Sequence, residues 1–391
     1  MLIYNHSLKS LFDVDFIILL IYIYPFVFYP LILYLACLFK RRSSDVGHIE
    51  NKCLPSVSII ISAYNEQDVI GDKIRNSLSL NYPKDRIEII VISDGSTDNT
   101  LTEARKFLGN GIIVVEMFER KGKTNSQNEG VKLSKGEVIV FSDANTILKR
   151  DSLRIIVECL LSSDRIGCVS GNLVYKSNKI SGELRYQNFD FLIKEMESRF
   201  FSITGANGAL YALRKEDYVP LPVDIISDFV EPLEIYRLKN RISIVSQDAI
   251  AFEDEPHKGN FKGTLERKSR ILLRGLQGLA YERSLLNPFR HFKMSFELLS
   301  HKLIKWFSPI LLLFVYFSPL FFLDKPEIII FTIFNLLILC ILFGYLFYKR
   351  NQKLSLFSYM FYFLEINLAD LLGWFYFLTR KRIATWETRG R

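Results

Sequence analysis

Two long apolar blocks bracket the chain and constrain its fold more than any other feature. From Phe16 to Phe39 no residue is charged, so this stretch would form a helix of about 36 Å, against a bilayer hydrocarbon core of about 30 Å. Pro25 and Pro30 lie inside it, and membrane helices tolerate proline better than soluble helices do. A second apolar block covers residues 303–378 and is interrupted by charged residues at two points. Because 49% of the residues are hydrophobic and 14% are aromatic, the sequence predicts a membrane protein.

The basic residues predict how the chain is oriented. Residues 40–42 (Lys-Arg-Arg) follow the first apolar stretch, which favours a cytoplasmic location for the polar region that comes next. The basic segments 349–353 and 380–382 cannot both be cytoplasmic if every apolar segment crosses the membrane. One segment is therefore expected to lie in the interface, and residues 355–378 are the candidate because they contain two acids and an asparagine.

The polar region between the apolar blocks is about 260 residues long, enough for one substantial α/β domain. Strand-like runs at 57–63, 87–93, 112–116 and 137–142 alternate with helical stretches. This alternation predicts a mostly parallel sheet with helices on both faces. In such sheets, ligands bind beyond the carboxyl ends of the strands.

Three of the predicted strands end in polar groups. These groups are Ala63-Tyr64-Asn65-Glu66, Asp94-Gly95-Ser96 and Asp143-Ala144-Asn145. Each group alone is a common turn or helix cap, whereas together they predict a single binding crevice. Asp94 is suited to accept hydrogen bonds from a nucleobase or ribose. Asp143 is suited to bind a divalent cation, because Mg²⁺ and Mn²⁺ prefer oxygen ligands and bridge readily to a diphosphate.

Basic residues near this crevice have two interpretations. Residues 120–123 (Arg-Lys-Gly-Lys) form either a solvated loop or a set of phosphate contacts. Residues 264–280 have the pattern of an amphipathic helix, with Arg267, Arg270 and Arg274 on its polar side. These arginines contact either lipid headgroups or, for one of them, a substrate diphosphate.

Asp228 also has two interpretations. It precedes a helical stretch, so it either caps that helix or acts as a general base. A glycine-rich turn, residues 204–209, leads into a further strand upstream of it. The sequence alone leaves both interpretations open.

The order of these motifs resembles the membrane-integrated family 2 glycosyltransferases, which include hyaluronan, cellulose and poly-N-acetylglucosamine synthases. The resemblance is strong over about residues 55–279, and the arrangement of helix, domain and helices extends it over the whole chain. No single motif is specific, whereas six in the same order are highly specific. The resemblance implies a GT-A-like nucleotide-sugar-binding domain, a divalent cation (Mg²⁺ or Mn²⁺) and inverting sugar transfer from a nucleotide-sugar donor, with a UDP-sugar expected.

The resemblance also implies a role for each residue that matches a family motif. Ala63, Tyr64 and Glu66 would hold the uridine, Asp94 would contact the base, and Lys123 would lie near the nucleotide. Asp143 matches the first acid of the metal-binding Asp-x-Asp motif, and Asn145 stands at its second position. Gly205 and Asn207 belong to an acceptor-side segment, Asp228 matches the catalytic aspartate, and Arg270 would reach the diphosphate.

Several residues depart from the family pattern. Ser93, Asn145 and Ser227 stand where the family has acids. Residues 267–271 resemble the Gln-x-x-Arg-Trp motif of the processive enzymes but lack its tryptophan, which favours addition of a single sugar to a lipid-linked acceptor. Residues 385–389 (Thr-Trp-Glu-Thr-Arg) resemble the cytoplasmic tail of hyaluronan synthases, which favours synthesis and export of a polysaccharide. Both versions stay open.

The sequence thus predicts a multi-pass cell-membrane glycosyltransferase with a cytoplasmic catalytic domain. Its predicted divisions are an N-terminal tail (1–15), a transmembrane helix (16–39), a linker (40–56), the GT-A-like domain (57–255), amphipathic interfacial helices (256–302), transmembrane or interfacial helices (303–378) and a basic tail (379–391). The expected partners are a nucleotide-sugar donor, a glycan or lipid-linked acceptor and membrane lipids. No nucleic-acid partner is expected, because membrane flanks account for the net charge of +8. The alternative is a non-catalytic membrane scaffold that keeps the fold to bind a nucleotide or a partner.

Overall fold

The computed structural model describes most of the chain between the two tails. It covers residues 16–39, 50–109, 111–176, 182–254, 261–317, 332, 335–344, 346 and 355–381. The predicted N-terminal tail, the basic residues 40–42 and the motif at 385–389 lie outside the described residues.

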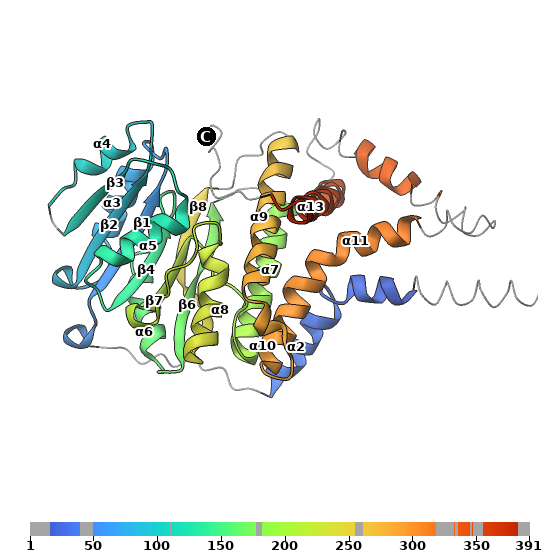
Figure 1. Cartoon of the computed structure of the whole chain (residues 1–391), viewed down its shortest axis with the longest axis horizontal. Coiled ribbons are helices and arrows are strands. Elements are labelled where there is room, and N and C mark those ends of the chain that lie inside the picture. Colours follow the sequence, from blue (N-terminus) through green and yellow to red (C-terminus); the bar gives the residue numbers. More distant parts are fainter. Residues whose placement is uncertain are drawn as a thin grey trace, which may run out of the picture.

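Eight strands form one mixed sheet in the described part of the chain (Figure 1). They are β1 (Val57–Ala63), β2 (Ile87–Asp94), β3 (Ile112–Met117), β4 (Val138–Asp143), β5 (Ile147–Leu148), β6 (Ile166–Lys176), β7 (Leu210–Arg214) and β8 (Ile242–Asp254). Their order across the sheet is β3-β2-β1-β4-β7-β6-β8-β5. The pairs β3–β2, β2–β1, β1–β4 and β6–β8 are parallel, whereas β7 runs antiparallel to both β4 and β6, and β5 runs antiparallel to β8. The predicted α/β class is confirmed.

Helices cover both faces of the sheet, as the alternating pattern predicts. On one face lie α3 (Ile70–Leu78), α4 (Thr100–Arg105) and α6 (Ser152–Leu161), which bury Ile74, Ala104 and Ile156 against one apolar core. On the other face lie α5 (Lys123–Leu133) and α8 (Ser227–Lys239), which bury Val131 and Ile235 against a second core. Burial on both faces explains why the central strands read as unbroken apolar runs.

The central parallel strands bring the predicted polar groups to one edge of the sheet. In the β1–β2 ladder Ala63 is paired with Ser93, and in the β1–β4 ladder Ser62 is paired with Asp143. The segments that follow β1, β2 and β4 therefore start side by side. This edge is where an open α/β sheet presents its ligand site.

Further helices lie on the β8 side of the sheet (Figure 1). They are α2 (Phe28–Leu38), α7 (Gly182–Phe200), α9 (Phe261–Tyr281), α10 (Phe292–Glu297), a π-helical segment (Leu298–Leu303), α11 (Ile304–Phe317) and α13 (Ser355–Leu378). In the described residues, the segments Phe292–Phe317 and Met360–Leu378 are long and apolar enough to cross a membrane.

The first apolar stretch is bent, whereas the sequence predicts one continuous helix. Helices Phe16–Ile23 and Phe28–Leu38 meet at an angle of 50° and count as a third candidate span if they act together. Pro25 and Pro30 have no N–H to donate, so the regular hydrogen-bond ladder is interrupted at the bend.

Helix α13 runs crosswise to the other apolar helices. Figure 1 shows it end-on, while α2 and α11 lie across the view. It packs closely on α9, since a Cβ added at Gly373 would lie 2.9 Å from the Leu272 side chain and from the Ser269 carbonyl. This arrangement agrees with the expectation that residues 355–378 lie along the interface, which stays a prediction.

Candidate active site

A cavity of about 420 Å³ opens at the carboxyl ends of β1, β2 and β4. Nine of the eleven predicted site residues line it: Ala63, Tyr64, Glu66, Asp94, Lys123, Asp143, Asn145, Asp228 and Arg270. Gly205 and Asn207 are not among its lining residues. The chain therefore brings together side chains that are more than 200 positions apart in the sequence.

The loop after β1 is tied to the loop after β2. Asn65 adopts a left-handed backbone conformation (φ 53°), and its side-chain oxygen accepts a hydrogen bond from the Thr97 N–H at 2.9 Å. The Glu66 N–H donates to the Thr100 hydroxyl at 2.7 Å. The Arg120 guanidinium lies 3.5 Å from the centre of the Tyr64 ring, which forms an aromatic and cationic wall.

Asp94 organises the basic loop before α5. Its two carboxylate oxygens accept hydrogen bonds from the backbone N–H groups of Lys121 (2.9 Å) and Gly122 (2.8 Å). Gly95 (φ +66°) allows this loop to approach the end of β2, because a Cβ at position 95 would lie 2.9 Å from the backbone nitrogen of Arg120. Asp94 thus fixes Lys121 and Gly122 at the cavity wall, in addition to its predicted contact with the base, which stays a prediction.

Lys123 lies between two carboxylates at the centre of the cavity. Its ammonium forms an ion pair with Asp143 and donates to the Gly208 carbonyl at 3.2 Å. Burial would lower the pKa of Lys123, but the negative charges of Asp143 and Asp228 outweigh it and raise the pKa. Lys123 is therefore a fixed positive charge between the predicted metal ligand and the predicted base.

A buried lysine holds the turn at the end of β4 that carries Asp143. Lys73 is fully buried on α3 and donates to the Ser142 hydroxyl (2.7 Å) and to the Thr146 carbonyl (2.8 Å). Burial lowers its pKa to about 7, although Asp143 opposes this shift. Lys73 is not among the predicted site residues. Its signal in the sequence is a cation on the face of α3 that also carries the buried Ile70 and Ile74.

Asp228 occupies the first turn of α8 and lies against the glycine-rich turn. The Ala206 N–H donates to the backbone carbonyl of Asp228 at 2.8 Å. A Cβ added at Gly208 would lie 2.5 Å from the Asp228 Oδ2 atom and 2.8 Å from the Lys123 Nζ atom. Glycine at position 208 therefore leaves the space that these two charged groups occupy.

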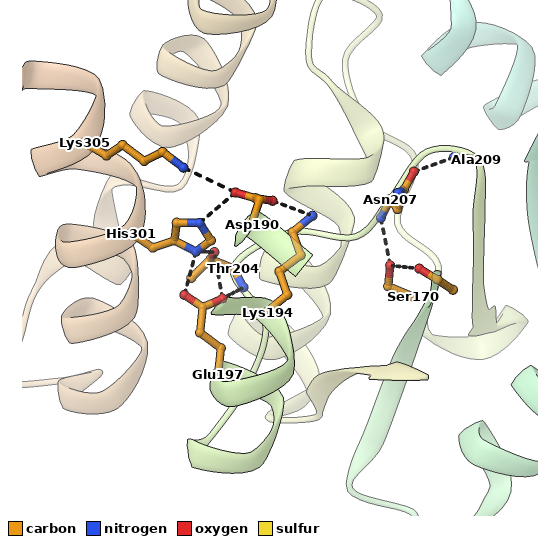
Figure 2. A network of polar contacts seen from close by, with 10 residues as sticks. Ser170, Asp190, Lys194, Glu197, Thr204, Asn207, Ala209, His301 and Lys305 are labelled. Atoms are coloured by element: carbon orange, nitrogen blue, oxygen red, sulfur yellow. Dashed lines mark hydrogen bonds and ion pairs between the residues drawn. The ribbon is translucent and has the colours of Figure 1, made fainter. Parts of the chain in front are cut away.

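Gly205 and Asn207 lie behind Asp228 and shape this turn. A Cβ at Gly205 would lie 3.0 Å from the Phe229 ring. The Asn207 N–H donates to the Ser170 hydroxyl at 2.9 Å, and its side-chain oxygen accepts from the Ala209 N–H at 3.0 Å (Figure 2). The structure thus gives both residues a conformational role, and their predicted contact with an acceptor stays a prediction.

The arginines of α9 face the cavity. Arg267, Arg270 and Arg274 all line it, while Leu272 and Leu276 on the other side of the helix are buried in protein. This placement favours the diphosphate interpretation over contact with lipid headgroups. Burial, together with Arg274, Arg267 and Arg120, lowers the pKa of Arg270 to about 10, which still leaves it charged at neutral pH.

A buried polar network links the apolar helices to the glycine-rich turn (Figure 2). Glu197 on α7 accepts a hydrogen bond from the Tyr29 hydroxyl at 2.7 Å and pairs with His301 Nδ1 at 2.7 Å. The Thr204 hydroxyl, at the start of the turn, lies 3.4 Å from the same carboxylate. The His301 Nε2 atom lies 3.1 Å from Asp190, which also contacts Lys305 at 3.3 Å. The turn that holds Asp228 is therefore anchored to the apolar helices.

The oxygen ligands present fit a metal ion that is held jointly with a substrate. In the described residues no group of three or more His, Cys, Asp or Glu side chains is placed to hold a metal. The cavity does contain the Asp143 carboxylate and the Asn145 amide two residues later. Mg²⁺ commonly takes one or two protein carboxylates and completes its coordination with phosphate oxygens and water.

Comparison with known proteins gives a family match for the central part of the chain. Residues 58–219 match the model of "Glycosyl transferase family 2". Over 185 residues, the chain is 30% identical to a poly-beta-1,6-N-acetyl-D-glucosamine synthase of Staphylococcus aureus (strain MSSA476), covering 46% of this chain and 43% of the relative. The corresponding synthase of Staphylococcus epidermidis is 29% identical over 171 residues, covering 42% of this chain and 41% of the relative. The matched segment thus spans less than half the length of these curated relatives.

A solved structure has the same fold over nearly the whole chain. It is the mannosyltransferase PcManGT from Pyrobaculum calidifontis in complex with GDP-Man and Mn²⁺, with a TM-score of 0.69 and 20% sequence identity. The similarity covers 94% of this chain and 99% of that protein. At this level of identity the comparison establishes the GT-A-like fold, including the helices outside residues 58–219.

Proposed function

We propose that this chain, which contains a family 2 glycosyltransferase domain, is an inverting glycosyltransferase that works at the cytoplasmic face of a membrane. It would move a sugar from a nucleotide-sugar donor, with a UDP-sugar expected, to a glycan or lipid-linked acceptor. The observation that carries the proposal is the cavity in which Asp143, Lys123 and Asp228 lie together, facing the arginines of α9.

The walls of the cavity suit the parts of a nucleotide sugar. The Tyr64 and Arg120 wall offers flat surfaces to a base, and the ordered loop at Asp94 adds backbone groups beside it. Arg267 and Arg270 place positive charge where a diphosphate would lie, and charge-assisted hydrogen bonds to phosphate are among the stronger polar contacts. Asp228 lies against the glycine-rich turn, and the acceptor would enter beside it.

Asp228 would act as the general base of a single displacement. The acceptor hydroxyl oxygen forms a bond to the anomeric carbon as its proton passes to the Asp228 carboxylate. The bond from the anomeric carbon to the diphosphate oxygen breaks, and its electron pair stays on the departing nucleoside diphosphate. Attack opposite the leaving group inverts the anomeric configuration. A placed general base contributes about 10²–10⁴ in rate.

Asp143 and Asn145 would hold a divalent cation together with the donor's diphosphate. When bound, Mg²⁺ or Mn²⁺ supplies positive charge that neutralises the leaving group. Lys123 keeps a second positive charge between Asp143 and Asp228, so the two carboxylates do not repel each other across the site. Lys73 holds the turn that carries Asp143.

The test is donor turnover by the purified chain in lipid nanodiscs, with a panel of labelled UDP- and GDP-sugars and with Mg²⁺ or Mn²⁺. Asp228→Asn should lower turnover by about 10²–10⁴-fold and leave nucleotide affinity unchanged. Asp143→Ala should lose both turnover and the metal dependence of nucleotide binding. Asp164→Asn is the matched control, because the Asp164 side chain is fully exposed and outside the cavity lining.

The same experiment separates the enzyme from the scaffold alternative. A scaffold would bind nucleotide and turn over no donor, whether or not an acceptor is added. Normal turnover by Asp228→Asn would show that Asp228 is not the general base. Analysis of the product made by the unmodified chain would distinguish a polymer from the addition of a single sugar.

A further inference from the structure

A buried cluster of charged side chains lies where α7 meets two of the apolar segments (Figure 2). Its centre is the carboxylate of Glu197 on α7, a residue that is 0% exposed. This carboxylate accepts a hydrogen bond from the Tyr29 hydroxyl at 2.7 Å and lies 2.7 Å from the Nδ1 atom of His301. Tyr29 belongs to the bent candidate span, and His301 belongs to the candidate span Phe292–Phe317. Two apolar segments therefore meet at one carboxylate.

The charges of this cluster are paired with one another. The His301 Nε2 atom lies 3.1 Å from Asp190, which also pairs with Lys305 at 3.3 Å and with Lys194 at 3.5 Å. Replacing buried ion pairs by apolar side chains of similar volume is often neutral or stabilising, because charged groups lose their hydration on burial. A buried polar network of this kind is better explained by the single arrangement that it imposes on its members.

The helical segment that carries His301 has an unusual geometry. Residues Leu298–Leu303 are π-helical and lie between α10 and α11. Turns of this kind are rare and occur frequently at functional sites. Here the turn holds a histidine that is 2% exposed and contacts α7, inside a segment that is apolar enough to cross a membrane.

The cluster reaches the candidate active site through Thr204. The Thr204 hydroxyl lies 3.4 Å from the Glu197 carboxylate and 3.3 Å from His301 Nδ1, and the Thr204 N–H donates to the same carboxylate at 3.4 Å. Two residues further on, the Ala206 N–H donates to the backbone carbonyl of Asp228 at 2.8 Å. A shift of Thr204 would therefore be passed to Asp228 through two residues of backbone.

We propose that four residues of this cluster are positioning residues for the reaction, namely Tyr29, Glu197, His301 and Thr204. Tyr29 and His301 hold Glu197, Glu197 holds Thr204, and the turn that follows Thr204 holds the backbone of Asp228. The arrangement of the apolar segments thus sets the location of the general base, although none of the four residues lines the donor cavity. This inference rests on the proposed function and adds a control of its rate by the apolar part of the chain.

The test is a double-mutant cycle between the two ends of this chain of contacts, measured by donor turnover in nanodiscs. Thr204→Val keeps the shape of the side chain and removes its hydroxyl, whereas Tyr29→Phe removes only the hydroxyl that donates to Glu197. Each change should lower kcat about tenfold and leave the donor KM within about twofold, because a displaced general base slows the reaction without weakening the donor contacts. The double variant should also lose only about tenfold, because both changes interrupt the same network.

Matched variants separate the network from the side chain itself. Tyr34→Phe is the control for Tyr29→Phe, because Tyr34 lies on the same helix and is 55% exposed. Thr102→Val is the control for Thr204→Val, because Thr102 is exposed on α4. Thr204→Ser keeps the hydroxyl and should recover most of the kcat that Thr204→Val loses.

A second measurement does not depend on turnover. Hydrogen–deuterium exchange of the peptide that covers residues 204–209 reports the bond between the Ala206 N–H and the Asp228 carbonyl. Thr204→Val and Tyr29→Phe should each raise the exchange rate of this peptide about tenfold, because each loosens the turn locally. Exchange in the central strand β4 should stay the same.

Each outcome bears on the proposal. Loss of kcat in both single variants, no further loss in the double variant and faster exchange at residues 204–209 support it. Unchanged kcat with a lowered thermal midpoint would show that the cluster serves stability alone, and a loss of about 100-fold in the double variant would show that the two residues act independently. Either result overturns it. If the unmodified chain turns over no donor, the proposed function fails, and exchange then decides the link separately: faster exchange in both variants supports it and unchanged exchange overturns it.

Discussion

Gly208 offers the most direct test of the site geometry, because a single methyl group there would displace both central charges. A Cβ at this position would lie 2.5 Å from Asp228 Oδ2 and 2.8 Å from Lys123 Nζ. Ordinary contact begins at about 3.4 Å, so in Gly208→Ala the carboxylate must retreat by about 0.9 Å. Gly208 is not one of the glycines with positive φ, so the effect is steric and not a backbone strain.

The size of the effect follows from this displacement. A shift of about 1 Å in a reacting group costs on the order of 10²-fold in rate, or about 2.7 kcal/mol of transition-state stabilisation. We therefore expect kcat of Gly208→Ala to fall about 100-fold. The donor KM should change little, because the Tyr64 and Arg120 wall is untouched.

The assay is steady-state donor turnover in nanodiscs, beside a thermal melt that reports folding. Gly71→Ala is the control, since a Cβ there would meet only the Arg75 guanidinium, at 3.5 Å or more. Turnover by Gly208→Ala within twofold of the unmodified chain would show that the position of Asp228 does not limit the reaction. The assignment of Asp228 as general base would then fail.

Three further results are expected. Burial lowers the pKa of Lys73 in the folded chain from 10.5 to about 7, so between these two pH values the unfolded chain binds one more proton than the folded chain does. The thermal midpoint should therefore rise with pH across this window, and Lys73→Met should flatten that rise. Arg270→Gln should weaken nucleoside diphosphate binding about tenfold by calorimetry, and an unchanged affinity would place the diphosphate elsewhere. Glu197→Gln removes the buried charge that is paired with His301, so it should lower the free energy of unfolding by about 3 kcal/mol. Glu119→Gln is the control and should leave the free energy of unfolding unchanged, because the Glu119 side chain is 80% exposed.

The sequence predicted the part of the site that depends on parallel strands. Strands that are buried on both faces are continuous apolar runs, so the positions of β1, β2, β3 and β4 could be read directly. Parallel pairing then required their polar ends to meet, which brought Tyr64, Asp94 and Asp143 to one cavity. No comparable pattern marks β6 and β8, whose shorter apolar runs are interrupted by polar residues and a bulge.

The rest of the site depends on contacts between distant segments. Periodicity in α9 identified the residues that share each side, but it could not tell which neighbour covers them. The structure places α13 over the apolar side near Leu272 and leaves Arg270 in the cavity. In the same way, the role of Lys73 depends on its contact with Thr146, and the role of Gly208 depends on its contact with Asp228. Neither contact can be predicted from the sequence pattern.

The packing of α13 on α9 has a consequence for how this domain could be isolated. The segment that matches the family model ends at residue 219, whereas one wall of the cavity is built by arginines between 267 and 274. That helix is held in place by a partner that itself belongs to the apolar part of the chain. A fragment cut at the boundary of the recognisable domain would thus be open on one side, with three of its cations missing. The apolar helix α13 therefore helps to shape a cavity from which it is more than 80 residues distant in the sequence.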